Sequence, residues 1–223
     1  MLVRHSPDLG TIVAPLSFLG MRIGTRMTVV RLPSGGLVLH SPTPLALARD
    51  LVTAEGKVAH IVCPNLYHHL YAAEWAAAFP DAVVHAPKKL RTKRGDLRID
   101  RDLEDATLAT FEEALVPVPI DGSALGETVF VHPASRTLVS ADLTEYFTSS
   151  DHLPTRLYLK AAGVWNKPTW NRFLRFLYRD KRAARRSIDG LLEHDFDRVT
   201  IGHGDVIETE GREAIRGSFE FLG

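Results

Sequence analysis

The alternation of apolar and polar residues divides the N-terminal third of the chain into short elements. Residues 27–32 and 36–41 are apolar and flank Pro-Ser-Gly-Gly, a turn sequence that predicts a β-hairpin. Thr43 and Pro44 then offer an N-cap and a first helical residue for a helix over 45–53. The residues before the hairpin have no strong period, so we expect an irregular lead-in there.

The rest of the chain mixes strand-like segments with amphipathic helices. After a helix that reaches about Ala78, a polar surface loop is expected over 88–100. A helix from Trp170 to about His194, broken near Arg179-Asp180, precedes one more strand and a closing amphipathic helix. The other predicted strands lie at 59–63, 82–87, 115–120, 128–132, 137–142 and 198–201. This order favours an α/β sandwich with helices outside over a doubly wound parallel sheet.

Composition and charge narrow the class of protein. The 223 residues are 45% hydrophobic and contain no internal repeat or linker, so we expect one domain, 1–223. Basic and acidic residues number 27 each, so the formal net charge is zero and gives no overall attraction to nucleic acid as a partner. No apolar stretch approaches the ~20 residues of a transmembrane helix. With no signal-peptide pattern and a single cysteine, Cys63, a soluble cytoplasmic protein is expected.

Imidazole and carboxylate side chains follow three of the predicted strands. His68 and His69 come after one strand, Asp142 ends another, and His203 follows a third between two glycines. Side chains at such strand ends commonly meet ligands, and these types suit zinc, iron or manganese. Taken singly, each has a structural alternative as a turn, cap or loop residue. The other histidines show no such clustering and are expected at the surface or in local hydrogen bonds. Glycine-rich phosphate-binding loops are absent, which argues against a nucleotide site.

These positions resemble the metallo-β-lactamase fold superfamily over roughly residues 25–210. Its members begin with a hairpin, carry a strand ending in His-x-His-x-Asp-His, and later have strands ending in Asp and in Gly-His. Here SAD at 140–142 and IGHG at 201–204 match. The motif PN-x-x-HH, followed later by RTLVSADL, looks most like domain-of-unknown-function family 4336. The resemblance implies an αββα fold of two mixed sheets with outer helices. It also implies a helical insertion or lid at 143–195.

The same resemblance shows what this chain lacks. Pro64, Leu66 and Ser123 stand where the superfamily keeps the histidines of its first metal site. The four candidate ligands named above correspond to the second site, which implies one divalent ion, with zinc first and iron or manganese as alternatives. If all four bind, the site is closed and structural. If one stays free, a water with a lowered pKa could attack an ester, lactone, thioester or phosphoester.

Three further residues are candidates for catalysis. Glu127 could act as an outer base, and Asn65 or Tyr67 could contact a small-molecule substrate. The alternatives are a surface charge for Glu127 and a turn residue for Asn65. Two hypotheses follow: a single-metal hydrolase, or a catalytically degenerate protein that binds a small molecule or a protein partner without turnover. An iron-centred oxidoreductase ranks lower, because a di-iron centre needs the missing ligands.

Residues 165–186 interleave aromatic and basic side chains. On a helix, one face would carry the apolar residues Trp170, Phe173, Phe176 and Leu177. Such a face is expected to pack onto the domain, with the basic residues solvated. This segment lies between the candidate ligands Asp142 and His203 in the sequence, which favours a role as a lid. Contact with a membrane surface or an anionic partner is the alternative.

Overall fold

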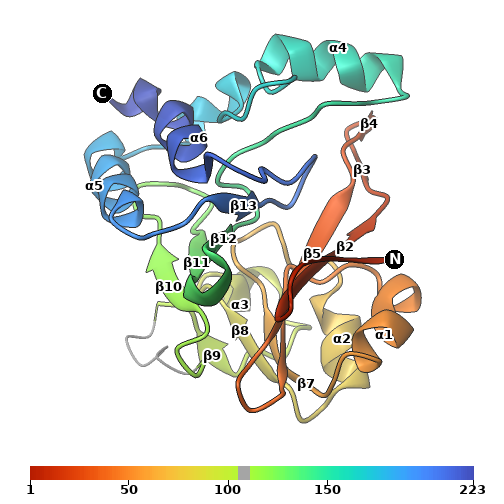
Figure 1. Ribbon diagram of the computed structural model, residues 1–223. Coiled ribbons are helices and arrows are strands. Elements are labelled where there is room, and N and C mark those ends of the chain that lie inside the picture. Colours follow the sequence, from red (N-terminus) through yellow and green to blue (C-terminus); the bar gives the residue numbers. More distant parts are fainter. Residues whose placement is uncertain (105–110) are drawn as a thin grey trace.

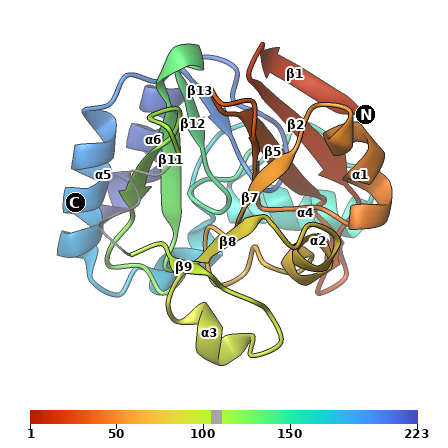
Figure 2. The same ribbon diagram turned by 90° about the horizontal axis from the view of Figure 1, so that it is seen from below.

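Two β-sheets lie face to face between two layers of helices in the computed structural model, which describes residues 1–104 and 111–223 (Figures 1 and 2). The larger sheet contains β1 (Leu2–Ser6), β2 (Leu9–Ala14), β5 (Thr25–Arg31), β6 (Leu37–His40), β7 (Val58–Val62), β8 (Val83–Ala86) and β9 (Arg101–Asp102). The smaller sheet contains β10 (Val116–Pro119), β11 (Thr128–His132), β12 (Thr137–Val139) and β13 (Arg198–Thr200). A separate hairpin consists of β3 (Ser17–Phe18) and β4 (Met21–Arg22).

Both sheets are mixed. In the larger sheet β5 and β6 are antiparallel, whereas β6, β7, β8 and β9 run parallel to one another. In the smaller sheet β11 and β12 are antiparallel, and β12 and β13 are parallel. The predicted αββα arrangement of two mixed sheets with outer helices is therefore confirmed.

The helices cover the outer faces of the two sheets and one end of the sandwich (Figures 1 and 2). They are α1 (Leu45–Thr53), α2 (Ala72–Ala78), α3 (Leu90–Lys93), α4 (Leu153–Ala162), α5 (Lys181–Leu192) and α6 (Gly211–Ser218). Three 3₁₀ turns are η1 (Pro133–Ser135), η2 (Arg172–Leu177) and η3 (Glu220–Leu222). Figure 2 shows α1 and α2 outside the larger sheet and α5 and α6 outside the smaller one. Helix α4 lies across one end of the sandwich (Figure 1).

The period of two along each strand divides its side chains between separate cores. Met27 and Val29 of β5 join the cluster that packs against α1 and α2, while Val30 joins the cluster between the sheets. Val129 of β11 faces α5 and α6, and its neighbour Phe130 faces the larger sheet. Because successive side chains in a strand point to opposite faces, one alternating sequence supplies both cores.

The N-terminal prediction was wrong. The segment expected to be irregular forms β1, β2 and the β3–β4 hairpin, because β2 pairs with β5 along its whole length, from Leu9 with Val30 to Ala14 with Thr25. The loop expected over 88–100 also contains the short helix α3.

The expected cap of α1 was also wrong. The N-cap is Pro44, and the buried Thr43 hydroxyl makes no hydrogen bond within the described part of the chain. Glu74 Oε1 accepts from the Leu45 N–H instead, at 2.8 Å.

The helix expected from Trp170 to His194 breaks where the sequence indicated. Turn η2 ends at residue 177, and α5 begins after Asp180, whose side chain accepts from the Ala183 N–H at 3.0 Å. The packing prediction for its first half was wrong, however. Trp170 is buried, but Phe173 and Phe176 are 49% and 71% exposed because the 3₁₀ turn does not hold them on one helical face. No helix among the described residues is both long and apolar enough to cross a membrane.

Two histidines that were expected at the surface or in local hydrogen bonds lie inside the molecule. His40 and His85 are both buried, and the prediction was wrong for His40, whose Nε2 has no hydrogen-bond partner within the described residues. His85 Nε2 lies 3.0 Å from Nδ1 of His60 on the neighbouring strand β7, so the two form a hydrogen-bonded pair. His40 packs edge-on against Phe130 between the sheets.

Candidate metal centre

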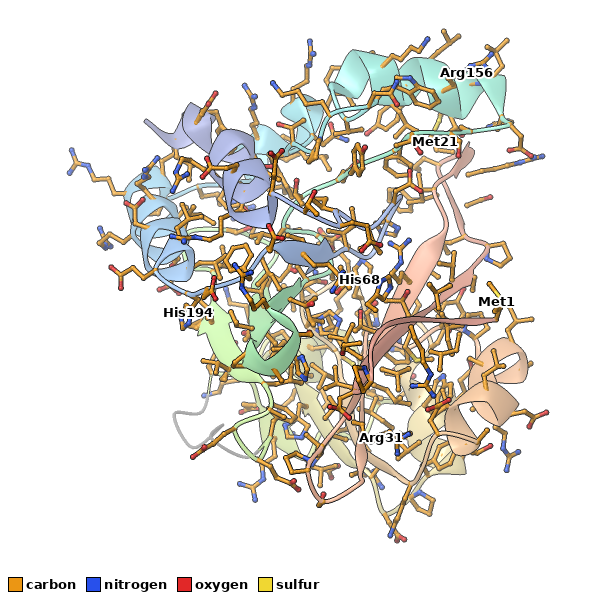
Figure 3. All side chains as sticks on the ribbon, viewed as in Figure 1. Met1, Met21, Arg31, His68, Arg156 and His194 are labelled. Atoms are coloured by element: carbon orange, nitrogen blue, oxygen red, sulfur yellow. The ribbon has the colours of Figure 1, made fainter. Side chains whose placement is uncertain are left out.

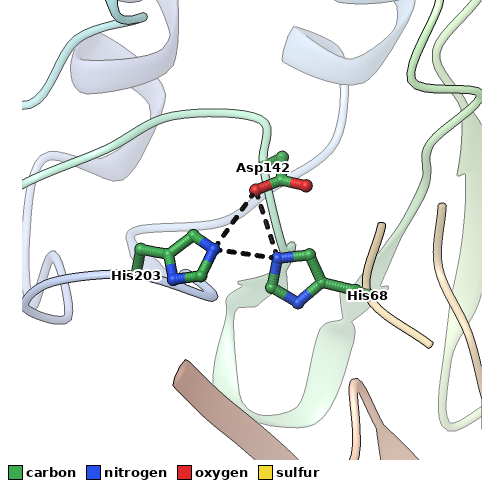
Figure 4. A group of neighbouring side chains, drawn as sticks. All are labelled: His68, Asp142 and His203. Atoms are coloured by element: carbon green, nitrogen blue, oxygen red, sulfur yellow. Dashed lines mark hydrogen bonds and ion pairs between the residues drawn. The ribbon is translucent and has the colours of Figure 1, made fainter. Parts of the chain in front are cut away.

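His68, Asp142 and His203 converge at the ends of strands from both sheets (Figure 4). His68 Nε2 lies 3.1 Å from Asp142 Oδ1 and 3.2 Å from His203 Nε2. His203 Nε2 lies 3.7 Å from Asp142 Oδ1. Asp142 and His203 follow β12 and β13, which are parallel neighbours, so both arrive at the same end of the smaller sheet. His68 follows β7 of the larger sheet.

These separations suit a single divalent ion. Ligand atoms arranged tetrahedrally at 2.0–2.2 Å from an ion are about 3.3–3.6 Å apart, by the geometry usual for zinc. The three observed separations, 3.1, 3.2 and 3.7 Å, bracket that value. Two imidazoles and a carboxylate are ligands that zinc, iron and manganese all accept. The residues present therefore fit a metal ion.

Each imidazole is oriented through its second nitrogen. His203 Nδ1–H donates to the Gly24 carbonyl oxygen at 2.6 Å, which leaves the lone pair of Nε2 facing the cluster. His68 Nδ1 lies 2.6 Å from Ser41 Oγ. Sequence reasoning missed both partners. Ser41 follows β6, the parallel neighbour of β7, so its position at a strand end was a usable signal, whereas Gly24 acts through a backbone carbonyl that any residue carries.

Two glycines allow the close approach of His203 to the other ligands. A Cβ at Gly202 would lie 2.4 Å from His68 Cε1, and a Cβ at Gly204 would lie 1.9 Å from the Tyr146 carbonyl oxygen. Gly204 also has a φ of +84°, which other residues rarely adopt. Only the Gly-His-Gly sequence therefore fits this loop against its neighbours.

Asn65 is a buried link between the ligands. Its Oδ1 accepts from the N–H groups of Tyr67 and His68 at 2.8 and 2.9 Å, which forms the turn after β7. Its Nδ2 donates to Asp142 Oδ2 at 2.8 Å and to Glu127 Oε2 at 3.3 Å. Asn65 is 0% exposed, so it lies too deep to contact a substrate and instead orients Asp142 and His68.

Glu127 is also buried, and its carboxylate shapes the loop that carries Asp142. Its Oε1 accepts from the Ala141 and Asp142 N–H groups at 2.8 and 3.1 Å. Burial, together with the nearby charge of Asp142, raises the pKa of Glu127 to about 7. Glu127 is thus neither a surface charge nor open to solvent as an acid or base would need. Tyr67, by contrast, is half exposed, and Lys93 Nζ lies 4.5 Å from the centre of its ring.

His69 lies apart from the three converging residues. Its Nδ1 accepts from the Arg94 guanidinium at 2.8 Å. Burial and the positive charges of Lys93 and Arg94 lower the pKa of His69 to about 4. His69 is bonded to Arg94, and only His68 of the pair faces Asp142. A set of four ligands that includes His69 does not form in this structure.

Positions 64, 66 and 123 bring no second set of ligands. Pro64 and Leu66 have no side-chain atom that binds a metal ion. Ser123 Oγ accepts from the Leu125 N–H at 3.2 Å. Within residues 1–104 and 111–223, this cluster is the one place where three or more metal-ligating side chains converge.

The charges of the three candidate ligands depend on one another. Burial disfavours the imidazolium form of His68, but the adjacent Asp142 carboxylate raises its pKa above the ordinary value. Burial, together with His68, lowers the pKa of His203 to about 4. Although burial opposes it, the imidazole of His68 holds the pKa of Asp142 well below its usual range. At neutral pH His203 is therefore neutral and Asp142 is ionised, as metal ligands must be.

A cleft of about 610 Å³ lies beside the cluster. Gly24, Gly202 and Gly204, which surround His203, form part of its wall, and Arg22 and Asp151 line it further out. The side chains of His203 and Asp142 remain 15% and 18% exposed. A small molecule could therefore approach the cluster from solvent.

The fold is that of the metallo-β-lactamases. A metallo-β-lactamase from Pontibacter korlensis superimposes with a TM-score of 0.68 at 12% identity, covering 100% of this chain and 98% of the other. The metallo-β-lactamase FIM-1 from Pseudomonas aeruginosa, in a mono-zinc form, superimposes with a TM-score of 0.69 at 10% identity, covering 100% and 94%. Identities this low show a shared fold, and the predicted superfamily resemblance is confirmed at that level.

A sequence family also matches part of the chain. Residues 15–90 match the family described as Domain of unknown function (DUF4336). The match includes the turn that carries Asn65, His68 and His69, and it confirms the resemblance to this family that the PN-x-x-HH motif predicted. No curated protein sequence matches the chain.

Proposed function

We propose that the protein is a hydrolase that uses one divalent metal ion held by His68, Asp142 and His203. The observation that carries the proposal is the separation of their three ligand atoms, 3.1, 3.2 and 3.7 Å, close to that of a tetrahedral site. A bound ion would supply Lewis acidity and lower the pKa of a water toward ~7 for attack on an ester, lactone, thioester or phosphoester. Zinc is the first candidate ion, and iron or manganese are the alternatives.

The position of His69 supports an open site. Catalytic zinc sites use three protein ligands and keep one coordination position free, whereas structural sites use four. With His69 bonded to Arg94, this chain supplies three ligands. The mono-zinc form of FIM-1 is consistent with one ion in this fold.

The surrounding residues hold the ligands in position. The Gly24 carbonyl keeps the proton on His203 Nδ1, and Asn65 holds the second oxygen of Asp142. The Arg26 guanidinium donates to the carbonyls of Ile201 and Gly204, on either side of His203, at 2.7 and 2.6 Å. Tyr67 is the predicted substrate contact that solvent can reach.

The proposed lid is smaller than the predicted segment 143–195. Phe147, Ser149 and Asp151 line the cleft, and α4 follows them directly. Helix α5 instead packs against the smaller sheet through Ile188 and Leu191, as part of the outer layer. We propose that residues 147–151 border the substrate and that α5 has a structural role.

The test is the metal content of protein purified without chelator. We expect near one equivalent in the parent protein, lost in His68→Ala and in His203→Ala. His69→Ala is the matched control, since it removes an adjacent imidazole outside the cluster and should keep the ion. A screen of ester, lactone, thioester and phosphodiester substrates, with and without chelator, would then identify the reaction.

A binding protein without turnover is the second candidate. It is favoured by the absence of side-chain ligands at Pro64 and Leu66 and by the burial of Glu127, which removes an accessible base. A parent protein without bound metal would contradict the hydrolase proposal, and this second candidate would then lead.

A further inference from the structure

One end of the molecule carries exposed apolar side chains from three separate segments. We call the outer sides of the β3–β4 hairpin, α4 and η2 the apical surface; Figure 1 shows the hairpin and α4 at this end. The Arg22 N–H donates to Thr155 Oγ1 at 2.9 Å, which joins the hairpin to α4. The rings of Tyr158 and Phe173 lie 6.0 Å apart, which joins α4 to η2. Its exposed large apolar residues are Phe18, Leu19, Leu153, Leu157, Phe173 and Phe176.

The apical surface is also strongly basic. Residues 153–177, from α4 through η2, contain five Lys or Arg and no acidic residue, in a chain whose totals are 27 and 27. All five basic side chains are exposed on α4, on η2 or in the loop between them: Arg156, Lys160, Lys167, Arg172 and Arg175. Within the described residues, no salt bridge involves any of these five.

The sequence of α4 places both features on its outer face. The inner face, with Thr155, Leu159 and Ala162, is buried. The outer face alternates leucine with basic residues, Leu153, Arg156, Leu157 and Lys160, at helical spacing. Figure 3 shows Arg156 pointing away from the body of the molecule, with Met21 of the hairpin nearby. A helix that only covers a domain needs no leucines on its solvent face.

We propose that the apical surface docks onto an anionic lipid bilayer. The leucine and phenylalanine side chains would enter the boundary between headgroups and acyl chains, and the Arg and Lys side chains would meet the anionic headgroups. Single-stranded nucleic acid fits less well, because aliphatic side chains such as Leu153 and Leu157 cannot stack with bases as aromatic rings do. A second copy fits less well because two equally basic surfaces repel each other.

The test compares vesicle binding by two surface variants. The full chain is mixed with vesicles of phosphatidylcholine alone, or with about one third phosphatidylglycerol, and sedimented at low and at high salt. The test variant is Arg156→Glu with Leu157→Ser. The control is Arg49→Glu with Leu47→Ser on α1, where Leu47 is 54% exposed against 58% for Leu157. None of these four residues touches the metal centre.

The expected result is binding of the parent protein to anionic vesicles at low salt, weak binding to neutral vesicles, and loss at high salt. Each cation near an anionic surface contributes roughly fivefold in partitioning, so the test variant should bind at least about tenfold less. The control variant should bind like the parent. No binding by the parent, equal binding by the test variant, or preference for single-stranded RNA would overturn the proposal. So would a stable dimer that the test variant disrupts. The outcome is independent of metal content and hydrolase activity.

Discussion

Replacing Asn65 by alanine removes the side chain that ties the His68 turn to Asp142. The change deletes four hydrogen bonds, two accepted from the N–H groups of Tyr67 and His68 and two donated to Asp142 and Glu127. Asn65 is fully buried, so water cannot easily replace the lost partner. We therefore expect loss of stability and weaker metal binding together.

The magnitude follows from the groups left without a partner. Tyr67 is half exposed and its N–H can be hydrated, whereas the His68 N–H and Asp142 Oδ2 stay largely enclosed. A buried polar group without a partner costs about 1–3 kcal/mol, so the two together lower the free energy of unfolding by about 2–6 kcal/mol. Loss of a group that orients metal ligands typically lowers metal affinity about 10- to 100-fold.

Asn171→Ala is the matched control. Asn171 is equally buried, its Oδ1 accepts from the Phe173 N–H at 3.1 Å, and its Nδ2 donates to the Tyr158 hydroxyl at 3.0 Å. It does not contact the candidate ligands, so its loss should lower stability and leave metal affinity unchanged. Urea unfolding measures the stability, and competition with a chromophoric chelator measures the affinity. Equal metal affinity in the parent protein and both variants would refute the positioning role of Asn65.

Three further predictions test the loops and the buried histidine. Gly202→Ala should displace the His68 ring and lower metal affinity at least about tenfold, because the new Cβ lies 2.4 Å from His68 Cε1. Gly217→Ala on α6, whose new Cβ meets open space, should bind metal normally. Equal affinity of the two variants in chelator competition would contradict the role of His68 as a ligand. Arg26→Met should lower the urea-unfolding free energy by about 2–4 kcal/mol, since two carbonyls lose charged partners; an unchanged midpoint would contradict this. Complete burial, with a smaller effect of His68, lowers the pKa of His40 to about 3. Its contribution to stability is therefore complete above about pH 6.5 and lost as the pH falls toward 3, at about 1.4 kcal/mol per pH unit. His40→Leu should reduce that slope between pH 7 and 5, and an unaltered slope would count against the depressed pKa.

Much of the fold could be predicted because local period and turn chemistry identify strands and helices. The hairpin at 27–41 follows from the Pro-Ser-Gly-Gly turn, and the break before α5 lies where the pattern predicted it, near Arg179-Asp180. The N-terminal strands could not be predicted in this way. Their structure comes from pairing with β5, a long-range contact that leaves no period in the segment itself.

The candidate site, like the fold, was partly predictable from the sequence. The sequence alone indicated that His68, His69, Asp142 and His203 follow strands, and parallel strands bring their ends together. Which imidazole of the pair faces Asp142 was decided by the turn that Asn65 forms and by the Arg94 bond to His69. Residue type and spacing do not encode that choice.

The sequence pattern by itself favoured an α/β sandwich with outer helices, since alternation and amphipathic period indicate which face of each element is buried, and the resemblance implied the αββα layering. Only the tertiary structure decided burial where no period exists. It placed Asn65 and Glu127 in the interior, where their hydrogen bonds orient ligands, and it left Phe173 and Phe176 exposed beside α4. The physical reason is that the buried face of a strand or helix can be recognised from apolar residues that recur two or four positions apart. A side chain in a loop depends on segments that are distant along the chain.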